Sequence, residues 1–103
     1  MSNDLTRSIR DQWTHLSGGW EQQREYLREA SQPVHDWLVE RLMPSEGETV
    51  LEISAGPGDT GFFAAPRLGA RGKLVSTDIL PAMVDVARGR AGELGVGNAE
   101  FRV

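Results

Sequence analysis

Residues 51–61 combine an apolar run with a glycine-rich turn, and this stretch is well suited to binding a ligand. The letters read LEISAGPGDTG, and Gly56 and Gly58 flank Pro57 within it. Glycine has no side chain, so a ligand can approach the backbone of such a turn closely. Asp78 lies 20 residues beyond Gly58, where its carboxylate can accept hydrogen bonds from both hydroxyls of a ribose. Together the two features predict a nucleoside site, with backbone contacting one part of the ligand and a carboxylate holding its sugar.

The same turn also obeys the pattern G-x-G-x-x-G of dinucleotide-binding domains, through Gly56, Gly58 and Gly61. Two neighbouring residues argue against a dinucleotide. Pro57 stiffens the turn, and Glu52 stands four residues ahead of Gly56. A carboxylate at that distance repels a pyrophosphate and attracts a cationic amine. An NAD(P)- or FAD-binding domain of an oxidoreductase is therefore the alternative interpretation.

Strands and helices alternate around these residues. The expected strands cover residues 49–53, 73–78 and 99–103. We expect Asp59 or Thr60 to cap a helix that runs to Leu68, and Gly69 to end it. Pro81 is expected to open the next helix. Such alternation is typical of right-handed βαβ crossovers around a parallel sheet. The predicted fold class is therefore α/β, an incomplete Rossmann-like doubly wound sheet of which the chain holds a β-α-β-α-β half.

Helices are expected before that half, because residues 4–43 have a helical pattern rich in Glu, Gln and Arg. Gly18 and Gly19 are expected to interrupt the pattern once. Ser31 is a suitable N-cap for a fresh helix with Pro33 in its first turn, where the missing N–H has no consequence. The expected division of the chain is an N-terminal helical cap over residues 1–47 and the sheet-containing half over residues 48–103.

Two motifs resemble those of the class I S-adenosylmethionine-dependent methyltransferases. The first motif of that family runs acidic-x-Gly-x-Gly-x-Gly after an apolar strand, and residues 52–58 are similar to it, with Ser54 in place of the first glycine. The second is an acidic residue at the end of strand two, here Asp78. The resemblance covers about residues 49–103, and it looks most like the small-molecule methyltransferases related to the ubiquinone and menaquinone enzymes.

The resemblance implies S-adenosylmethionine as the cofactor and methyl transfer to a small-molecule acceptor as the reaction. It implies that Glu52 lies near the methionine amino group and that Asp78 holds the ribose hydroxyls. Ile79 and Met83 would lie beside the adenine ring. The cofactor-binding residues expected on this basis are Glu52, Ser54, Ala55, Gly56, Pro57, Gly58, Asp78, Ile79 and Met83. Because the donor methyl group is already activated, the protein chiefly supplies positioning and excludes water. No catalytic residue is identified.

Histidines and tryptophans of the N-terminal helices are not expected to contact the cofactor. His15 and His35 belong to no recognisable constellation and are expected to face solvent. Trp13, Trp20 and Trp37 are expected to be core or interface anchors. By position alone, these helices look like the family's N-terminal cap over the cofactor.

Composition excludes several classes of function. The 103 residues form one domain at most, and the net charge of −4 with scattered arginines argues against a nucleic-acid partner. Cysteine is absent, which removes disulfides and thiolate chemistry and suits the cytoplasmic location that we expect. No metal site is expected without cysteine or clustered carboxylates. No apolar run approaches the ~20 residues of a membrane span, and the N-terminus has no export signal.

The family's sheet has the strand order 3-2-1-4-5 with two more strands beyond, and this chain supplies strands 3, 2 and 1 only. Residues 49–53 would then form an uncovered apolar edge, which invites pairing. We therefore expect the N-terminal portion of a longer methyltransferase, or a chain completed by a complementary chain or a second copy. Alone it should bind the cofactor weakly and catalyse nothing. A truncated, non-catalytic remnant of the fold that serves as an interaction module is a further alternative.

Overall fold

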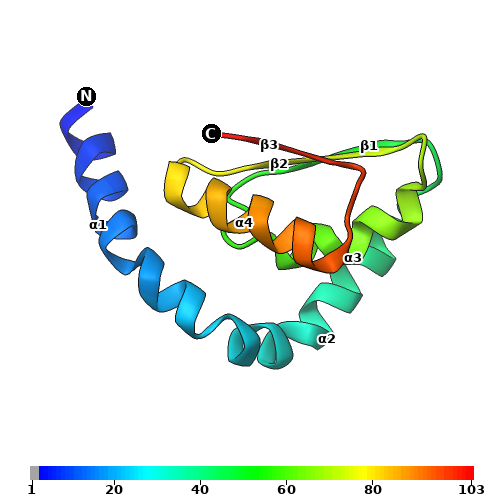
Figure 1. The fold of residues 1–103 in the computed structure, drawn as a ribbon, viewed down its shortest axis with the longest axis horizontal. Helices are drawn as coiled ribbons and strands as arrows, with labels where there is room; N and C mark the ends of the chain where they lie inside the picture. The colour runs from blue at the N-terminus through cyan, green and yellow to red at the C-terminus, as the bar shows by residue number, and fades with distance from the viewer. Residues whose placement is uncertain (1–2) are drawn as a thin grey trace.

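The structure is a computed structural model that describes residues 3–103 as four helices and three strands (Figure 1). The elements are α1 (Asn3–Gln22), α2 (Arg24–Leu42), β1 (Thr49–Glu52), α3 (Asp59–Leu68), β2 (Lys73–Thr77), α4 (Pro81–Leu94) and β3 (Ala99–Arg102). Residues 1 and 2, at which the expected helical cap begins, lie outside the described residues. Within residues 3–103, no helix is long and apolar enough to cross a membrane.

The three strands form a parallel sheet in the order β1-β2-β3. Val50 pairs in register with Leu74, and Leu74 with Ala99. The α/β class and the β-α-β-α-β half of a doubly wound sheet are therefore confirmed. Each strand ends one residue earlier than expected, at Glu52, Thr77 and Arg102.

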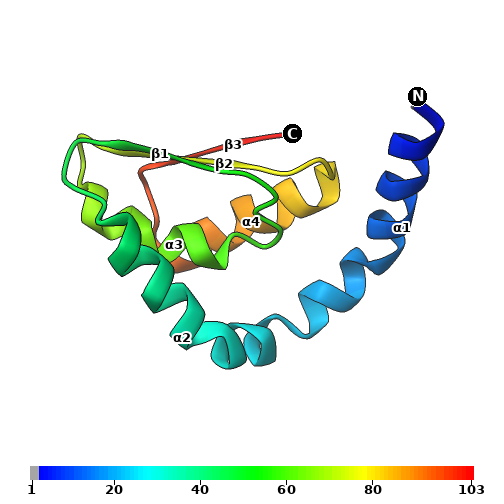
Figure 2. The ribbon, with the colours of Figure 1, turned by 180° about the vertical axis from the view of Figure 1, so that it is seen from behind.

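Helices cover one face of the sheet only, since α3 and α4 both lie on the same side of it (Figures 1 and 2). The buried cluster between these layers consists of Phe62, Ala65, Leu68, Leu74, Ala87 and Ala91. Side chains alternate along a strand, so Val50 and Phe101 pack against this cluster. Leu51 and Ile53 are instead 62% and 75% exposed. In the described part of the chain, β1 pairs on one edge only, as expected for strand one of an incomplete sheet.

The N-terminal helices separate at Gln23, and the predicted break at Gly18 and Gly19 is wrong. α1 runs through both glycines, and the Gln23 amide still donates to the Gly19 carbonyl at 3.0 Å. Glycine lowers helix propensity by about 1 kcal/mol relative to alanine but does not end a helix by itself. Across the glycine pair, Trp13 and Trp20 pack with ring centroids 6.1 Å apart, and this contact requires a continuous helix.

Ser31 does not begin a new helix, and Pro33 lies inside α2 rather than in a first turn. Pro33 lacks the N–H that would donate one turn back, and the ribbon of α2 changes direction along its length (Figure 2). Contacts on both sides of the proline keep the helix in place. On the N-terminal side of the proline, the Glu25 carboxylate accepts a hydrogen bond from the Arg90 guanidinium. On its C-terminal side, the Val39 side chain is buried. Tertiary contacts therefore outweigh the local helix-start signal.

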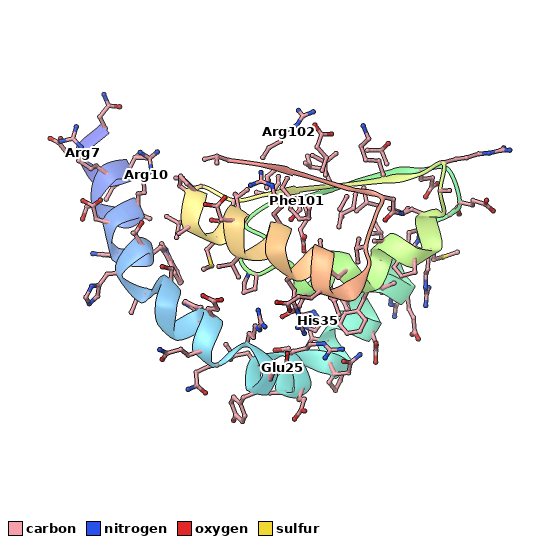
Figure 3. All side chains as sticks on the ribbon, viewed as in Figure 1. Arg7, Arg10, Glu25, His35, Phe101 and Arg102 are labelled. Carbon is pink, nitrogen blue, oxygen red and sulfur yellow. The ribbon has the colours of Figure 1, made fainter. Side chains whose placement is uncertain are left out.

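An ion cluster ties the beginning of α2 to α4. The buried Arg90 side chain lies 2.8 Å from Glu25 and 3.3 Å from Glu93, and Arg24 lies 3.4 Å from Glu93. Figure 3 shows Glu25 on the part of α2 that passes beneath α4. Because α1 ends just before this cluster, α4 also fixes where α1 is attached.

His35 is half-buried against α3, so the prediction that it faces solvent is wrong, whereas His15 is exposed as predicted. The His35 ring stacks on Phe63 with centroids 5.4 Å apart, and its Nδ1 lies 2.7 Å from Thr60 Oγ1. The Thr60 hydroxyl therefore hydrogen-bonds to a side chain of α2 and does not cap α3.

Gly58 is the N-cap residue of α3, and the predicted capping by Asp59 or Thr60 is wrong. Its φ of 90° suits glycine, and a Cβ there would lie 2.8 Å from the Phe62 ring. The predicted end of α3 and the predicted start of α4 are confirmed. Gly69 follows the last residue of α3, and Pro81 opens α4.

Two glycine substitutions test this packing. Gly72 follows α3, and a Cβ there would meet the carbonyl oxygens of Leu68 and Glu48, so Gly72→Ala should lower the free energy of unfolding by about 1–3 kcal/mol. Gly89 lies inside α4 with open space around it, so Gly89→Ala should raise that free energy by about 0.5–1 kcal/mol. Urea unfolding followed by circular dichroism measures both. A Gly72→Ala chain as stable as the parent would contradict the packing described.

Candidate functional site

The glycine turn between β1 and α3 lies at the carboxyl end of the sheet and bonds to the neighbouring strand. The Ala55 amide donates to the Thr77 carbonyl at 2.9 Å, and the Gly58 amide donates to the Ala55 carbonyl at 3.0 Å. Positive φ angles occur at Ser54 (57°), Gly56 (57°) and Gly58 (90°). Ser54, which stands where the resembled motif has its first glycine, thus adopts a backbone conformation that glycine favours.

The Asp78 carboxylate joins this turn to the beginning of α4. Its Oδ2 accepts a hydrogen bond from the Gly56 amide at 2.9 Å, and its Oδ1 accepts one from the Leu80 amide at 2.9 Å. Leu80 is the N-cap residue of α4. An ionised carboxylate has about four acceptor positions, so Asp78 keeps acceptor capacity for the hydroxyls of a ligand.

Glu52 points beneath the turn toward the first residues of α3. Its Oε2 accepts from the Gly61 amide at 3.0 Å, and its Oε1 accepts from the Ser76 hydroxyl at 3.3 Å. Burial raises the pKa of this carboxyl to about 7, although both hydrogen bonds act in the opposite direction, and the nearby Asp59 carboxylate adds to the rise. Glu52 therefore changes its charge near neutral pH.

A cavity of about 360 Å³ lies over the carboxyl ends of the strands. It is lined by Trp13, Trp20, Ser54, Ala55, Gly56, Pro57, Asp78, Ile79, Leu80 and Met83. Its volume is at the lower end of the ~300–1,000 Å³ typical of small-molecule sites. α1 lies across from the carboxyl ends of the strands (Figure 1), and its side chains Trp13 and Trp20 line the cavity on that side.

The cavity brings together all the residues expected at the site except Glu52 and Gly58. Gly58 is buried beneath it, between Phe62 and Ala87. Three lining residues were not expected there, namely Trp13, Trp20 and Leu80. The two tryptophans lie seven residues apart on one helical face, which is the one signal that could have grouped them.

A second, more open hollow of about 680 Å³ lies at the opposite ends of the strands, beside Gly69, Gly72 and Gly97. Its polar side chains are already engaged. The Asn98 amide donates to the Ala65 and Gly69 carbonyls at 2.8 and 3.0 Å, and Lys73 lies 3.5 Å from Glu100. Ligands of open α/β sheets bind at the carboxyl ends of the strands. The smaller cavity is therefore the candidate site, and among residues 3–103 no cluster of three or more His, Cys, Asp or Glu could hold a metal ion.

Comparison with known proteins gives one family. Residues 44–103 match the family model described as a methyltransferase domain. Aklanonic acid methyltransferase DauC of Streptomyces sp. (strain C5) is 38% identical over 71 residues, which is 69% of this chain and 32% of that protein. Nocamycin O-methyltransferase of Saccharothrix syringae is 34% identical over 71 residues, covering 69% of this chain and 25% of that protein. The chain thus spans about a third or less of the length of these relatives.

Solved structures give the same fold. A SAM-dependent methyltransferase from Aquifex aeolicus superposes with a TM-score of 0.61 at 26% identity, over 66% of this chain and 36% of that chain. A SAM-dependent O-methyltransferase from Thermotoga maritima superposes with a TM-score of 0.66 at 17% identity, over 69% of this chain and 27% of that chain. The second likeness supports the fold alone, and both confirm the Rossmann-like arrangement.

Replacing Ser54 by glycine should stabilise the fold. A non-glycine residue at this φ is strained by about 1 kcal/mol or more, and the added freedom of glycine in the unfolded chain offsets part of the relief. Ser54→Gly should therefore raise the free energy of unfolding by about 0.5–1 kcal/mol. Ser54→Ala is the control, because it removes the hydroxyl and keeps the strain. Equal stability of the two variants in urea would contradict the strained turn.

Glu52→Gln should change how stability depends on pH. The folded pKa lies above the ordinary 4.5, so the stability that this group contributes is present below pH 4.5 and is lost as the pH rises through about 7. A shift of this size corresponds to about 3 kcal/mol, and the neutral amide removes that dependence. Glutamine can still accept from Gly61, and its NH₂ can donate to the Ser76 hydroxyl.

Urea unfolding at several pH values between 4 and 8 measures this effect, with Glu29→Gln on the exposed side of α2 as the control. We expect the Glu52→Gln chain to be the more stable one at pH 8 and to lose less stability between pH 5 and 8. Parallel pH profiles for this variant and the parent chain would contradict the buried, protonatable state of Glu52.

Proposed function

Since the chain belongs to the methyltransferase domain family, we propose that it supplies the S-adenosylmethionine-binding part of an enzyme that methylates a small molecule. One observation carries the proposal. The glycine turn and the Asp78 carboxylate meet in a cavity at the carboxyl end of a parallel sheet. The names of two relatives, which refer to aklanonic acid and nocamycin, support a small-molecule acceptor.

The residues at the cavity fit this cofactor. The remaining acceptor positions of Asp78 suit the two hydroxyls of a ribose, and residues 54–57 of the turn line the cavity where the methionine and ribose region would lie. Ile79 and Met83 offer an apolar surface for the adenine ring. When bound, S-adenosylmethionine supplies an activated methyl group on a sulfonium. The chain's own contribution is to orient this group and to exclude water.

Glu52 acts from behind the turn in this proposal. The family resemblance implies that Glu52 lies near the methionine amino group, whereas its carboxyl group accepts hydrogen bonds from Gly61 and Ser76 outside the cavity lining. When it is ionised, above a pH of about 7, this carboxylate attracts an ammonium group in front of the turn. It also holds the first turn of α3 in position.

No general base is assigned. Asp78 is the one titratable side chain among the described residues that line the cavity, and both of its oxygens already accept backbone hydrogen bonds. Any base that the acceptor requires must come from elsewhere in the enzyme.

We further propose that residues 1–47 act as a helical cap and residues 48–103 as the cofactor-binding half. The exposed Leu51 and Ile53 and the unpaired edge of β1 support completion of the sheet by more of the same enzyme, by a complementary chain or by a second copy. The acidic net charge supports the absence of a nucleic-acid partner. A cytoplasmic location stays a prediction.

Ligand titration distinguishes this proposal from the dinucleotide alternative. We expect isothermal titration calorimetry to show weak binding of S-adenosylhomocysteine to the chain and no binding of NADH. Binding of NADH alone would contradict the proposal. If neither ligand binds, even with the missing strands supplied, the non-catalytic remnant becomes the better interpretation.

Asp78→Asn should weaken this binding and the fold together. In asparagine an NH₂ group replaces one of the two carboxylate oxygens and cannot accept a hydrogen bond. Either the Gly56 or the Leu80 amide then loses its acceptor, which costs about 1–2 kcal/mol of folding free energy. We expect the affinity for S-adenosylhomocysteine to fall at least about tenfold, which corresponds to ~1.4 kcal/mol. Asp85→Asn on the exposed face of α4 is the control and should change neither quantity. Unchanged affinity of the Asp78→Asn chain would remove Asp78 from the site.

A further inference from the structure

Two tryptophans of α1 lie on the cavity wall across from the glycine turn and are not part of the buried core. Trp13 is 45% exposed and Trp20 is 39% exposed. Their rings are tilted by 39° and are not stacked face to face. The described helix α1 has no buried residue, so neither indole is needed to fill the core. Both nevertheless line the candidate cavity.

The charges around the cavity favour a cation. Asp78 contributes a carboxylate to the lining, and Glu52 places a carboxyl group behind the glycine turn that is mainly ionised above a pH of about 7. Among the described residues, no lysine, arginine or histidine lines this cavity. Indole faces carry partial negative charge, and tryptophan is the side chain that attracts cations most strongly through its ring. Carboxylates and indoles therefore act in the same direction.

We infer that Trp13 and Trp20 make this site discriminate between the methyl donor and its product. This inference rests on the proposed function and adds to it a property of two residues. S-adenosylmethionine carries a sulfonium cation, whereas S-adenosylhomocysteine has a neutral thioether at the same sulfur. The two ligands otherwise share the same methionine, ribose and adenine groups. Contact with indole faces stabilises the charged ligand preferentially, so the product leaves more easily than the donor.

The expected size of the effect follows from the strength of one cation–π contact. Such a contact changes affinity roughly 3- to 10-fold when it is partly shielded from water. Replacing an indole by an aliphatic side chain also removes apolar contact area, which weakens both ligands alike. The ratio of the two affinities isolates the contribution of the charge.

The test is calorimetric titration of the chain with S-adenosylmethionine and, separately, with S-adenosylhomocysteine. The variants are Trp13→Leu and Trp20→Leu, with Trp13→Phe and Trp20→Phe as conservative changes that keep an aromatic face. We expect each leucine variant to reduce the donor-to-product affinity ratio roughly 3- to 10-fold. The phenylalanine variants should retain part of the ratio. Circular dichroism verifies that the variants are folded.

Trp37→Leu is the matched control. Trp37 lies on α2, is 55% exposed and does not line the cavity, so its replacement should leave the ratio unchanged. An equal loss of affinity for both ligands in the Trp13 and Trp20 variants would overturn the inference and leave the indoles as packing surface. If the parent chain binds neither ligand, the proposed function fails first, and this inference fails with it.

Discussion

The candidate site depends on one interaction, the pair of hydrogen bonds that the Asp78 carboxylate accepts from Gly56 and Leu80. These bonds join the turn after β1 to the start of α4.

 The first of them spans 22 residues of sequence, and the second spans two, so a single side chain sets both a long-range and a local contact. The cavity exists because the turn and the helix start are held at this separation. A ribose hydroxyl would complete a hydrogen-bonding arrangement that the fold has already built.

The features that make the site usable also reduce stability. Ser54 adopts a left-handed backbone conformation, and the carboxyl of Glu52 is buried enough to raise its pKa to about 7. Leu51 and Ile53 leave apolar surface on the open face of the sheet. The core between the sheet and the α3–α4 layer must offset all three effects, although the net stability of native proteins is only about 5–15 kcal/mol. Strain of this kind is characteristic of functional sites.

The sequence was sufficient for the features that depend on local chemistry and strand periodicity. The three strands, the helix opened by Pro81, the end of α3 at Gly69 and the meeting of the glycine turn with Asp78 were all predictable. Two of the errors concern contacts between distant segments. Helix α2 continues through Pro33 because Glu25 and Val39 are held by other elements, and His35 is half-buried because Thr60 and Phe63 lie beside it. Nothing near these residues in the sequence specifies such partners.

The placement of Trp13 and Trp20 shows the same limit at the site itself. Their spacing predicts a shared helical face, but which surface that face meets depends on the ion cluster that attaches α2 to α4. The most direct test of the account is a map of the shifts of backbone amide and indole N–H signals in ¹H–¹⁵N spectra as S-adenosylhomocysteine is added. We expect shifts at Ala55, Gly56 and Gly58, at Asp78 and Ile79, and at the indole N–H groups of Trp13 and Trp20. Shifts confined to the opposite hollow around Gly95 and Gly97, or no shifts at all, would contradict it.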